Sequence, residues 1–220
     1  MKEEFSFETI KEFDNHLESS VMGYNNLNDL IMPIASYFVT PESNTYDIGC
    51  STGRLLKELS YRHAKTTASF IGYDISDNLL PKNEGGAVSF FNRDVTETSL
   101  TFFNTNLILS IFTLQFIEQA KRQALVRKIY NSLSPGGAFI VAEKIYLSNG
   151  KIQDIFTFSH YDLKRLSFSS KDILDKQIVL RRIMKINSDE ENLNMFHQAG
   201  FRNIETFWTS LNFKAYLCIK

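Results

Sequence analysis

Short apolar segments that end in a glycine or an acidic residue alternate with stretches of helical period, and this alternation constrains the fold more than any other feature. Strands that alternate with helices are joined by right-handed crossovers, which favour a parallel, doubly wound sheet. A near-continuous apolar run such as 107–112 is typical of a strand buried on both faces. The expected strands of this part of the chain lie at 46–48, 69–74, 87–91, 107–112 and 138–142.

The segments around these strands are predicted from the same periodicity. Residues 1–40 carry apolar side chains at helical spacing, with Gly23 between two halves. The polar run at 42–45 is expected to be a loop. A helix over 120–133 is expected to stop at the Pro-Gly-Gly of 135–137.

After the fifth expected strand the rhythm changes. Residues 150–185 fit one long helix or two shorter ones, and a further helix at 189–199 is closed by Gly200. Two late strands are expected around 204–208 and 215–219. The region 145–188 therefore reads as a helical insertion within the α/β fold.

Length and composition limit the possible functions. The 220 residues suit a single domain over 1–220, with 1–40 as its helical N-terminal segment. Because 24 basic residues face 25 acidic ones, no global positive field exists and direct nucleic-acid binding is not expected. Two cysteines form no disulfide framework, and no metal-ligand spacing is seen. With no apolar run long enough to span a membrane, we expect a cytoplasmic protein.

The turn after the first strand is the expected ligand site, because ligands of open α/β sheets bind at the carboxyl ends of the strands. Gly49 and Gly53 would let the backbone approach a ligand closely, with a helix N-terminus beyond them. Their spacing, Asp-x-Gly-x-x-x-Gly, differs from the Gly-x-Gly-x-x-Gly of dinucleotide binders. It favours S-adenosyl-L-methionine (SAM), which has no phosphate, over NAD.

Two acidic residues support the same interpretation. Asp74 ends the second strand, where a carboxylate can accept both ribose hydroxyls. Asp94 follows the third strand, where it can accept the adenine amino group. The alternative is that Asp47 and Asp94 only cap the segments that follow them.

Several blocks resemble the carboxy-S-adenosyl-L-methionine synthase family across nearly the whole chain. The most specific blocks are Phe-Thr-Leu-Gln-Phe at 112–116 and Arg-Gln-Ala-Leu at 122–125. The other resembling segments are 19–24, 46–51, 128–130, 133–137, 143–144, 160–165 and 199–201.

The resemblance implies a Rossmann-like class I methyltransferase fold, with a mostly parallel seven-stranded sheet covered by helices on both faces and an N-terminal helical lid. It implies that the enzyme converts SAM and prephenate to carboxy-SAM and phenylpyruvate, and that a partner enzyme uses the product on a wobble uridine of tRNA. It also implies a homodimer. The implied cofactor contacts are Tyr24, Gly49, Cys50, Ser51, Gly53, Asp74, Ile75, Asp94, Val95 and Ile111.

The chain departs from the family pattern at positions that bear on the reaction. The family arginine that pairs with the added carboxylate is Gln177 here, after Lys176. A neutral amide makes no charge-assisted bidentate bond. Arg181, one helical turn later, or Arg182 is the candidate replacement.

Three further departures concern the cofactor loops. Ile75 and Ile111 stand where the family has asparagine. The segment between Asp74 and Asp94 is also shorter than in the family, so the helix after the second strand is expected to be short or broken.

Three functions compete on this evidence. The first is a carboxy-SAM synthase, with Tyr24, His160 and Arg181 as candidate catalytic residues. The second is a methyltransferase that acts on another small acceptor, which the loss of the arginine at 177 favours. The third is a protein that binds SAM-type ligands without turnover.

Overall fold

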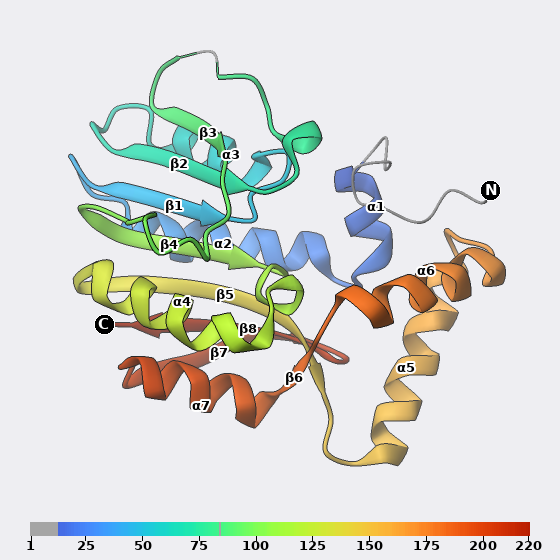
Figure 1. Ribbon diagram of the computed structural model, residues 1–220. Helices are drawn as coiled ribbons and strands as arrows, with labels where there is room; N and C mark the ends of the chain where they lie inside the picture. The colour runs from blue at the N-terminus through green and yellow to red at the C-terminus, as the bar shows by residue number, and fades with distance from the viewer. Residues whose placement is uncertain (1–12, 84) are drawn as a thin grey trace.

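The computed structural model describes residues 13–83 and 85–220. Its central sheet has the strand order β3-β2-β1-β4-β5-β8-β7, and the two-residue β6 pairs with β5 (Figure 1). The pairs among β1 to β5 are parallel, whereas β8 runs antiparallel to both β5 and β7. The strands are β1 (Asn44–Ile48), β2 (Ser69–Asp74), β3 (Val88–Asn92), β4 (Thr105–Ile111), β5 (Leu133–Tyr146), β6 (Asn187–Ser188), β7 (Asn203–Ser210) and β8 (Phe213–Ile219).

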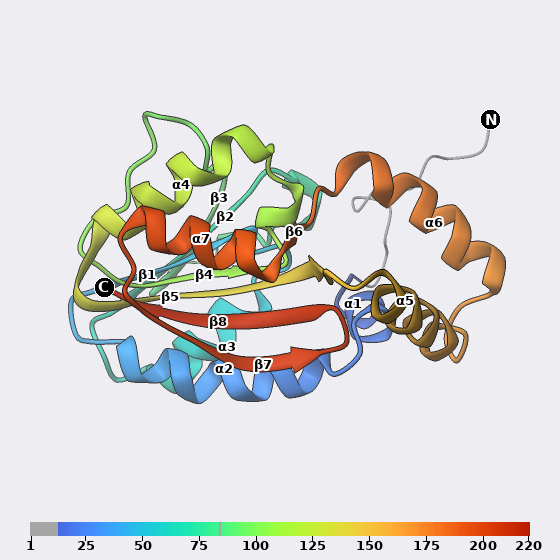
Figure 2. The same cartoon turned by 90° about the horizontal axis from the view of Figure 1, so that it is seen from below.

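Helices cover both faces of the sheet, as Figure 2 shows edge-on. On one face, α2 and α3 pack into one apolar core, and on the other α4 and α7 pack into a second. Helices α5 and α6 project beyond the carboxyl ends of the parallel strands, beside α1 (Figures 1 and 2). The helices are α1 (Phe13–Ser20), α2 (Tyr24–Phe38), α3 (Arg54–Arg62), α4 (Gln119–Ser132), α5 (Gly150–Lys164), α6 (Ser170–Ile183) and α7 (Asp189–Ala199), with 3-10 turns η2 (Asp77–Leu79) and η3 (Leu114–Phe116).

The predicted architecture is confirmed. Gly23 separates α1 from α2 with a left-handed φ of 80°, the insertion forms two helices, and the segment after β2 holds only the short η2 turn. The part of the N-terminal prediction that covers 1–12 lies outside the described residues. No helix among the described residues is long and apolar enough to cross a bilayer.

Two boundaries differ from the sequence prediction. The expected loop at 42–45 already contains the start of β1, because Asn44 and Thr45 pair with Ser69 and Phe70 of β2. The fifth strand is expected to start at residue 138, but β5 starts at Leu133, directly after α4, and includes the Pro-Gly-Gly of 135–137. In both places pairing with neighbouring strands outweighs the local turn preference.

The insertion is held at the sheet by a small parallel pairing. Ile145 and Tyr146 of β5 pair with Asn187 and Ser188 of β6. The chain therefore leaves the sheet and returns to it at the same point.

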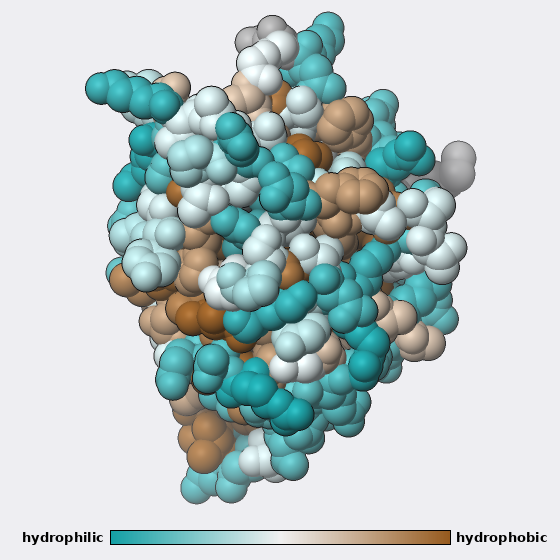
Figure 3. Space-filling model, turned by 90° about the vertical axis from the view of Figure 1, so that its left-hand side faces the viewer, coloured by the Kyte–Doolittle hydropathy of each residue, from teal (hydrophilic) through white to brown (hydrophobic). Residues whose placement is uncertain are grey.

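At the opposite end of the molecule, Figure 3 shows hydrophobic atoms in separate patches among hydrophilic ones.

Candidate active site

A cavity of about 410 Å³ lies at the carboxyl ends of the parallel strands. One side is lined by the turn after β1, the end of β2 and the loop after β4, and the other by α5 and α6, with α1 and the start of α2 between them. This is the position at which open α/β sheets bind ligands. The cavity therefore joins the predicted cofactor turn to the helical insertion.

The two glycines of the turn have different reasons for being glycine. Gly49 has a φ of 75°, lines the cavity, and a Cβ there would lie 2.2 Å from the Thr113 side chain. Gly53 has a φ of 70° and caps α3, and a Cβ there would lie 2.3 Å from the Phe90 ring. Gly53 does not line the cavity, so its close approach is to the protein rather than to a ligand.

The carboxylate of Asp74 lines the cavity and fixes two adjacent loops. Its Oδ2 accepts the Ser51 amide at 2.8 Å, and its Oδ1 accepts the Ser76 amide at 2.8 Å. Each carboxylate oxygen keeps a further lone pair for a ligand. Ile75 stands next to it at the mouth of the cavity, 73% exposed.

Asp47 and Cys50 form the floor near this turn. Burial, and then the charge of Asp74, raises the pKa of Asp47 to about 8. Burial also raises the pKa of the Cys50 thiol, so this cysteine is a packing residue rather than a thiolate. A cationic group of a bound ligand would stabilise the ionised carboxylate and lower the pKa of Asp47 again.

The N-terminal helices close over the turn. The Asp14 carboxylate accepts the Thr52 hydroxyl at 3.0 and 3.1 Å, and Glu18 pairs with Arg54 at 2.6 Å. Tyr24, at the start of α2, is 7% exposed and lines the cavity, and burial raises its pKa to about 12. Tyr24 is therefore placed to contact a ligand as a neutral phenol.

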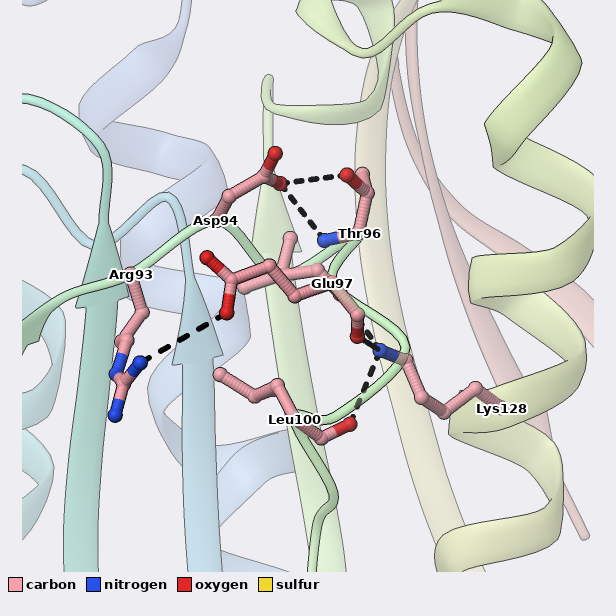
Figure 4. A network of polar contacts seen from close by, with 7 residues as sticks. Arg93, Asp94, Thr96, Glu97, Leu100 and Lys128 are labelled. Carbon is pink, nitrogen blue, oxygen red and sulfur yellow. Dashed lines mark hydrogen bonds and ion pairs between the residues drawn. The ribbon is translucent and has the colours of Figure 1, made fainter.

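Asp94 and Val95 lie near the site but do not line this cavity. Asp94 Oδ1 accepts the amide (2.8 Å) and the hydroxyl (2.7 Å) of Thr96, as Figure 4 shows. Although burial raises it, these hydrogen bonds hold the pKa of the Asp94 carboxyl below its ordinary value. Lys128 Nζ of α4 donates to three carbonyls of the same loop, those of Val95 (2.8 Å), Glu97 (2.8 Å) and Leu100 (3.2 Å).

The Phe-Thr-Leu-Gln-Phe block after β4 is held in place by a buried acid. The Glu143 carboxylate accepts the amides of Leu114 (2.9 Å) and Gln115 (2.8 Å). Burial raises the pKa of Glu143 to about 8, although these hydrogen bonds oppose the shift. Ile111, at the end of β4, lines the cavity with an apolar side chain.

Three lysines line the same cavity, one from the sheet and two from the insertion. Lys144 comes from β5, Lys164 from the last turn of α5 and Lys176 from α6. Burial lowers the pKa of Lys164 to about 8 and that of Lys176 to about 7, and each shift is increased by a neighbouring lysine. Burial also lowers the pKa of Lys144.

Two histidines stand beside these lysines. His160 Nε2 donates to the Ser20 carbonyl at 2.8 Å, which joins α5 to the end of α1. His16 accepts a short hydrogen bond from Lys176 Nζ. Burial, with the nearby lysine charges, lowers the pKa of both histidines to about 4, so both are neutral near pH 7.

The polar side chains of α5 and α6 fall into two sets in the structure. Lys164, Lys176 and Gln177 line the cavity, whereas Arg181 and Arg182 are exposed and do not line it. Each residue turns a helix by about 100°, so Gln177 stands at the edge of the face that carries Lys176, and Arg181 lies beyond that edge. Helical spacing alone does not show which of these cations are buried. One sequence signal for a buried Lys164 is its spacing: it follows His160 by four residues, which places both side chains on the same face of α5.

The cavity fits a SAM-type cofactor. Ser51 Oγ is buried without a hydrogen-bond partner at the turn, and the Asp47 carboxyl lines the floor. Together they offer a polar contact and a site for a cation, such as the ammonium or sulfonium of SAM. Within the described ranges, no group of three or more His, Cys, Asp or Glu side chains could hold a metal ion.

Comparison with known proteins identifies the class and the family. A methyltransferase-domain family model matches residues 46–137. Two solved structures share the fold. Human N-acetylserotonin methyltransferase in complex with SAM has a TM-score of 0.55 at 17% sequence identity, and the match covers 89% of this chain and 54% of that one. Haemonchus contortus phosphoethanolamine N-methyltransferase 2 has a TM-score of 0.65 at 14% identity, and the match covers 97% of this chain and 59% of that one. This chain spans little more than half of either. Fold and site thus define a SAM-dependent transferase with the class I methyltransferase fold.

Curated relatives of similar sequence show which family of SAM-dependent transferases the chain belongs to. The carboxy-S-adenosyl-L-methionine synthase of Staphylococcus epidermidis is 32% identical over 220 residues, covering 98% of this chain and 95% of that protein. The protein of the same name from Yersinia pestis strain Pestoides F is 30% identical over 223 residues, covering 98% and 84%. The chain belongs to the carboxy-S-adenosyl-L-methionine synthase family. Its cofactor is SAM or carboxy-SAM, and it acts on a small molecule.

Proposed function

We propose that this enzyme makes carboxy-SAM from SAM and prephenate, with release of phenylpyruvate. The relatives' names and their coverage of nearly the whole chain support this reaction. The observation that carries it is the single cavity that joins the cofactor turn to α5 and α6, because a second ligand can then lie beside SAM. In the proposed reaction prephenate breaks down to phenylpyruvate, CO₂ and hydroxide. The acidic sulfonium methyl of SAM loses a proton, and its carbon then binds the CO₂. The proton and the hydroxide combine to water.

The protein's own residues have distinct tasks in this proposal. Asp74 receives the ribose hydroxyls, and Tyr24, Ser51 and the Gly49–Cys50 backbone surround the methionine part. Asp94 and Val95 serve the adenine end. The apolar side chain of Ile111 lines the cavity and helps to keep water out, because water would destroy both a reactive carbanion and CO₂. His160 donates to the Ser20 carbonyl and so orients the insertion against α1.

A methyltransferase acting on another small acceptor is the second candidate. Gln177 favours it, because this amide lines the cavity where the family arginine would stand. The two functions differ in their product. A methyltransferase would leave S-adenosyl-L-homocysteine, whereas the synthase would leave a sulfonium compound heavier than SAM by one CO₂.

The deciding experiment incubates the protein with SAM and prephenate and analyses the products by mass spectrometry. We expect carboxy-SAM and phenylpyruvate in equal amounts, and neither when prephenate is left out. Gln177→Arg is assayed in parallel and should retain more carboxy-SAM after gel filtration. If neither protein makes carboxy-SAM, the synthase function is rejected and the methyltransferase function takes its place.

We also propose that the protein is a cytoplasmic homodimer that supplies carboxy-SAM to a tRNA-modifying partner enzyme without binding nucleic acid itself. Support for the dimer comes from large apolar side chains that are 44–82% exposed on α5, α6 and their connection. These residues are Ile152, Ile155, Phe158, Leu166, Leu174 and Ile178. Light scattering at micromolar concentration tests the dimer, and a monomer would contradict it.

A further inference from the structure

The basic side of the cavity consists of cations gathered where burial should exclude them. Lys164 is only 8% exposed, and Lys144 and Lys176 line the same cavity. Buried lysines are rare unless a counter-charge accompanies them. Lys164 Nζ has neither a hydrogen bond nor an ion pair with any residue in 13–83 or 85–220. Lys144 Nζ lies 5.7 Å from the centre of the Phe213 ring, a cation–π contact that supplies no counter-charge.

Among the residues that the structure describes, no acidic side chain is paired with Lys144 or Lys164. His160 and His16 are the titratable side chains beside it on α5 and α1, and both are neutral near pH 7. The acids that line the cavity, Asp14, Asp47 and Asp74, stand on or against the cofactor turn. A ligand that bridges the cavity would therefore meet acids at one end and ammonium groups at the other.

We infer that Lys144, Lys164 and Lys176 form a carboxylate-binding subsite that replaces the missing arginine at position 177. This inference rests on the proposed function, because the proposed reaction is what brings a carboxylate into the cavity. Three ammonium donors can each approach a carboxylate oxygen, and such charge-assisted hydrogen bonds are the strong ones. The carboxylate belongs either to the cofactor, as in carboxy-SAM, or to the second ligand, as in prephenate.

Calorimetric titrations separate these two sources. The probes are SAM alone, carboxy-SAM alone, and prephenate added to the SAM-saturated protein. They are applied to the unaltered protein, to Lys164→Met and Lys176→Met, and to the control Lys171→Met, which changes an exposed lysine of α6 paired with Asp175. Methionine keeps the length and apolar volume of the lysine stem, so packing is largely retained.

The expected loss in Lys164→Met is at least about tenfold in the affinity for one carboxylate ligand, as for one charge-assisted hydrogen bond. A loss confined to carboxy-SAM assigns the subsite to the cofactor, and a loss confined to prephenate assigns it to the second ligand. In both cases the affinity of Lys164→Met for SAM should change less than about twofold. The affinities of the Lys171→Met control for all three probes should also change less than about twofold. Unchanged affinities for both carboxylate ligands would overturn the inference.

A second measurement uses the unaltered protein and so does not depend on the stability of a variant. Because burial lowers the pKa of Lys176 to about 7 and of Lys164 to about 8, a bound carboxylate should raise both and draw protons from the buffer at pH 8. Titrations in buffers of different ionisation enthalpy should show greater proton uptake with carboxy-SAM, or with prephenate, than with SAM. Equal uptake for all three would overturn the inference. Loss of turnover with intact carboxylate binding would reject only the proposed reaction.

Discussion

The two sides of the cavity carry opposite charges and are built in different ways. The acidic side consists of Asp47 and Asp74, which lie at the ends of adjacent parallel strands and are fixed by the sheet. The basic side consists of Lys144, Lys164 and Lys176, which come from β5 and two helices of the insertion. The strands thus provide the acidic part of the site, whereas the insertion provides most of the basic part.

The acidic side is expected to show the largest effect through Asp47. Its pKa of about 8 in the folded protein lies above the ordinary value of 3.8, so folding favours the protonated carboxyl. This contribution is complete below about pH 4 and is lost as the pH rises toward 8, at up to about 1.4 kcal/mol per pH unit. Asp47→Asn should therefore unfold at a higher temperature than the unaltered protein at pH 8.

Thermal unfolding of the ligand-free protein at pH 4.5, 6 and 8 checks this expectation (about one to two pH units apart). The difference between Asp47→Asn and the unaltered protein should grow with pH. At pH 8 the variant should bind SAM more weakly, because an anionic partner of the cofactor is lost. A difference in unfolding temperature that does not change with pH would contradict the assignment.

Asp74→Ala should weaken SAM binding by about 1–3 kcal/mol, the cost of leaving buried polar partners unmet. The variant removes a ligand acceptor and also releases the amides of Ser51 and Ser76. Calorimetry with SAM measures the effect. Asp77→Ala is the matched control, because Asp77 is exposed and outside the cavity. Equal affinities for the two variants would exclude Asp74 from the cofactor site.

Lys128→Met is expected to have a smaller effect, about 1 kcal/mol after allowance for solvent screening of a partly exposed side chain. The variant removes the three hydrogen bonds that tie the loop after Asp94 to α4 (Figure 4). Chemical denaturation gives the change in stability, and adenosine binding reports whether the loop still presents Asp94. The control Lys121→Met alters an exposed lysine of the same helix, paired loosely with Glu118 at 3.8 Å.

Arg181→Gln should have the smallest effect, a change below about twofold in the affinity for carboxy-SAM. Arg181 is exposed and stands outside the cavity, unlike Lys176 on the same helix. Competition binding against SAM is sensitive enough to detect such a change. A tenfold loss in this variant would restore Arg181 as the replacement for the arginine at position 177 and would weaken the case for the lysines.

Much of the fold and of the acidic side could be predicted from the sequence because both depend on local patterns. The periodicity of apolar residues and the position of Asp74 at the end of a strand can both be recognised in short stretches of sequence. The parallel sheet then brings the carboxyl ends of its strands together at one edge. Tyr24 could be predicted only from the family resemblance, since no local sequence pattern distinguishes it from other aromatic residues of the core.

The basic side could not be predicted in the same way. Lys144, Lys164 and Lys176 are far apart in the sequence, and only the packing of α5 and α6 against α1 brings them together. Helical spacing placed Arg181 on the face of Gln177 correctly, but it could not show that Gln177 stands at the edge of the cavity. Likewise, Gly53 fits the turn motif, yet the contact that requires glycine is with Phe90.

The pairing of β5 with β6 has a consequence for how such enzymes diversify. Because Tyr146 and Ser188 are adjacent in space, residues 147–187 form a loop whose two ends meet at one point of the sheet. The entropy of closing a loop changes slowly with its length, so helices can be lengthened, shortened or exchanged there without altering the order of the strands. The part of the cavity that α5 and α6 line can therefore change while the cofactor turn stays the same.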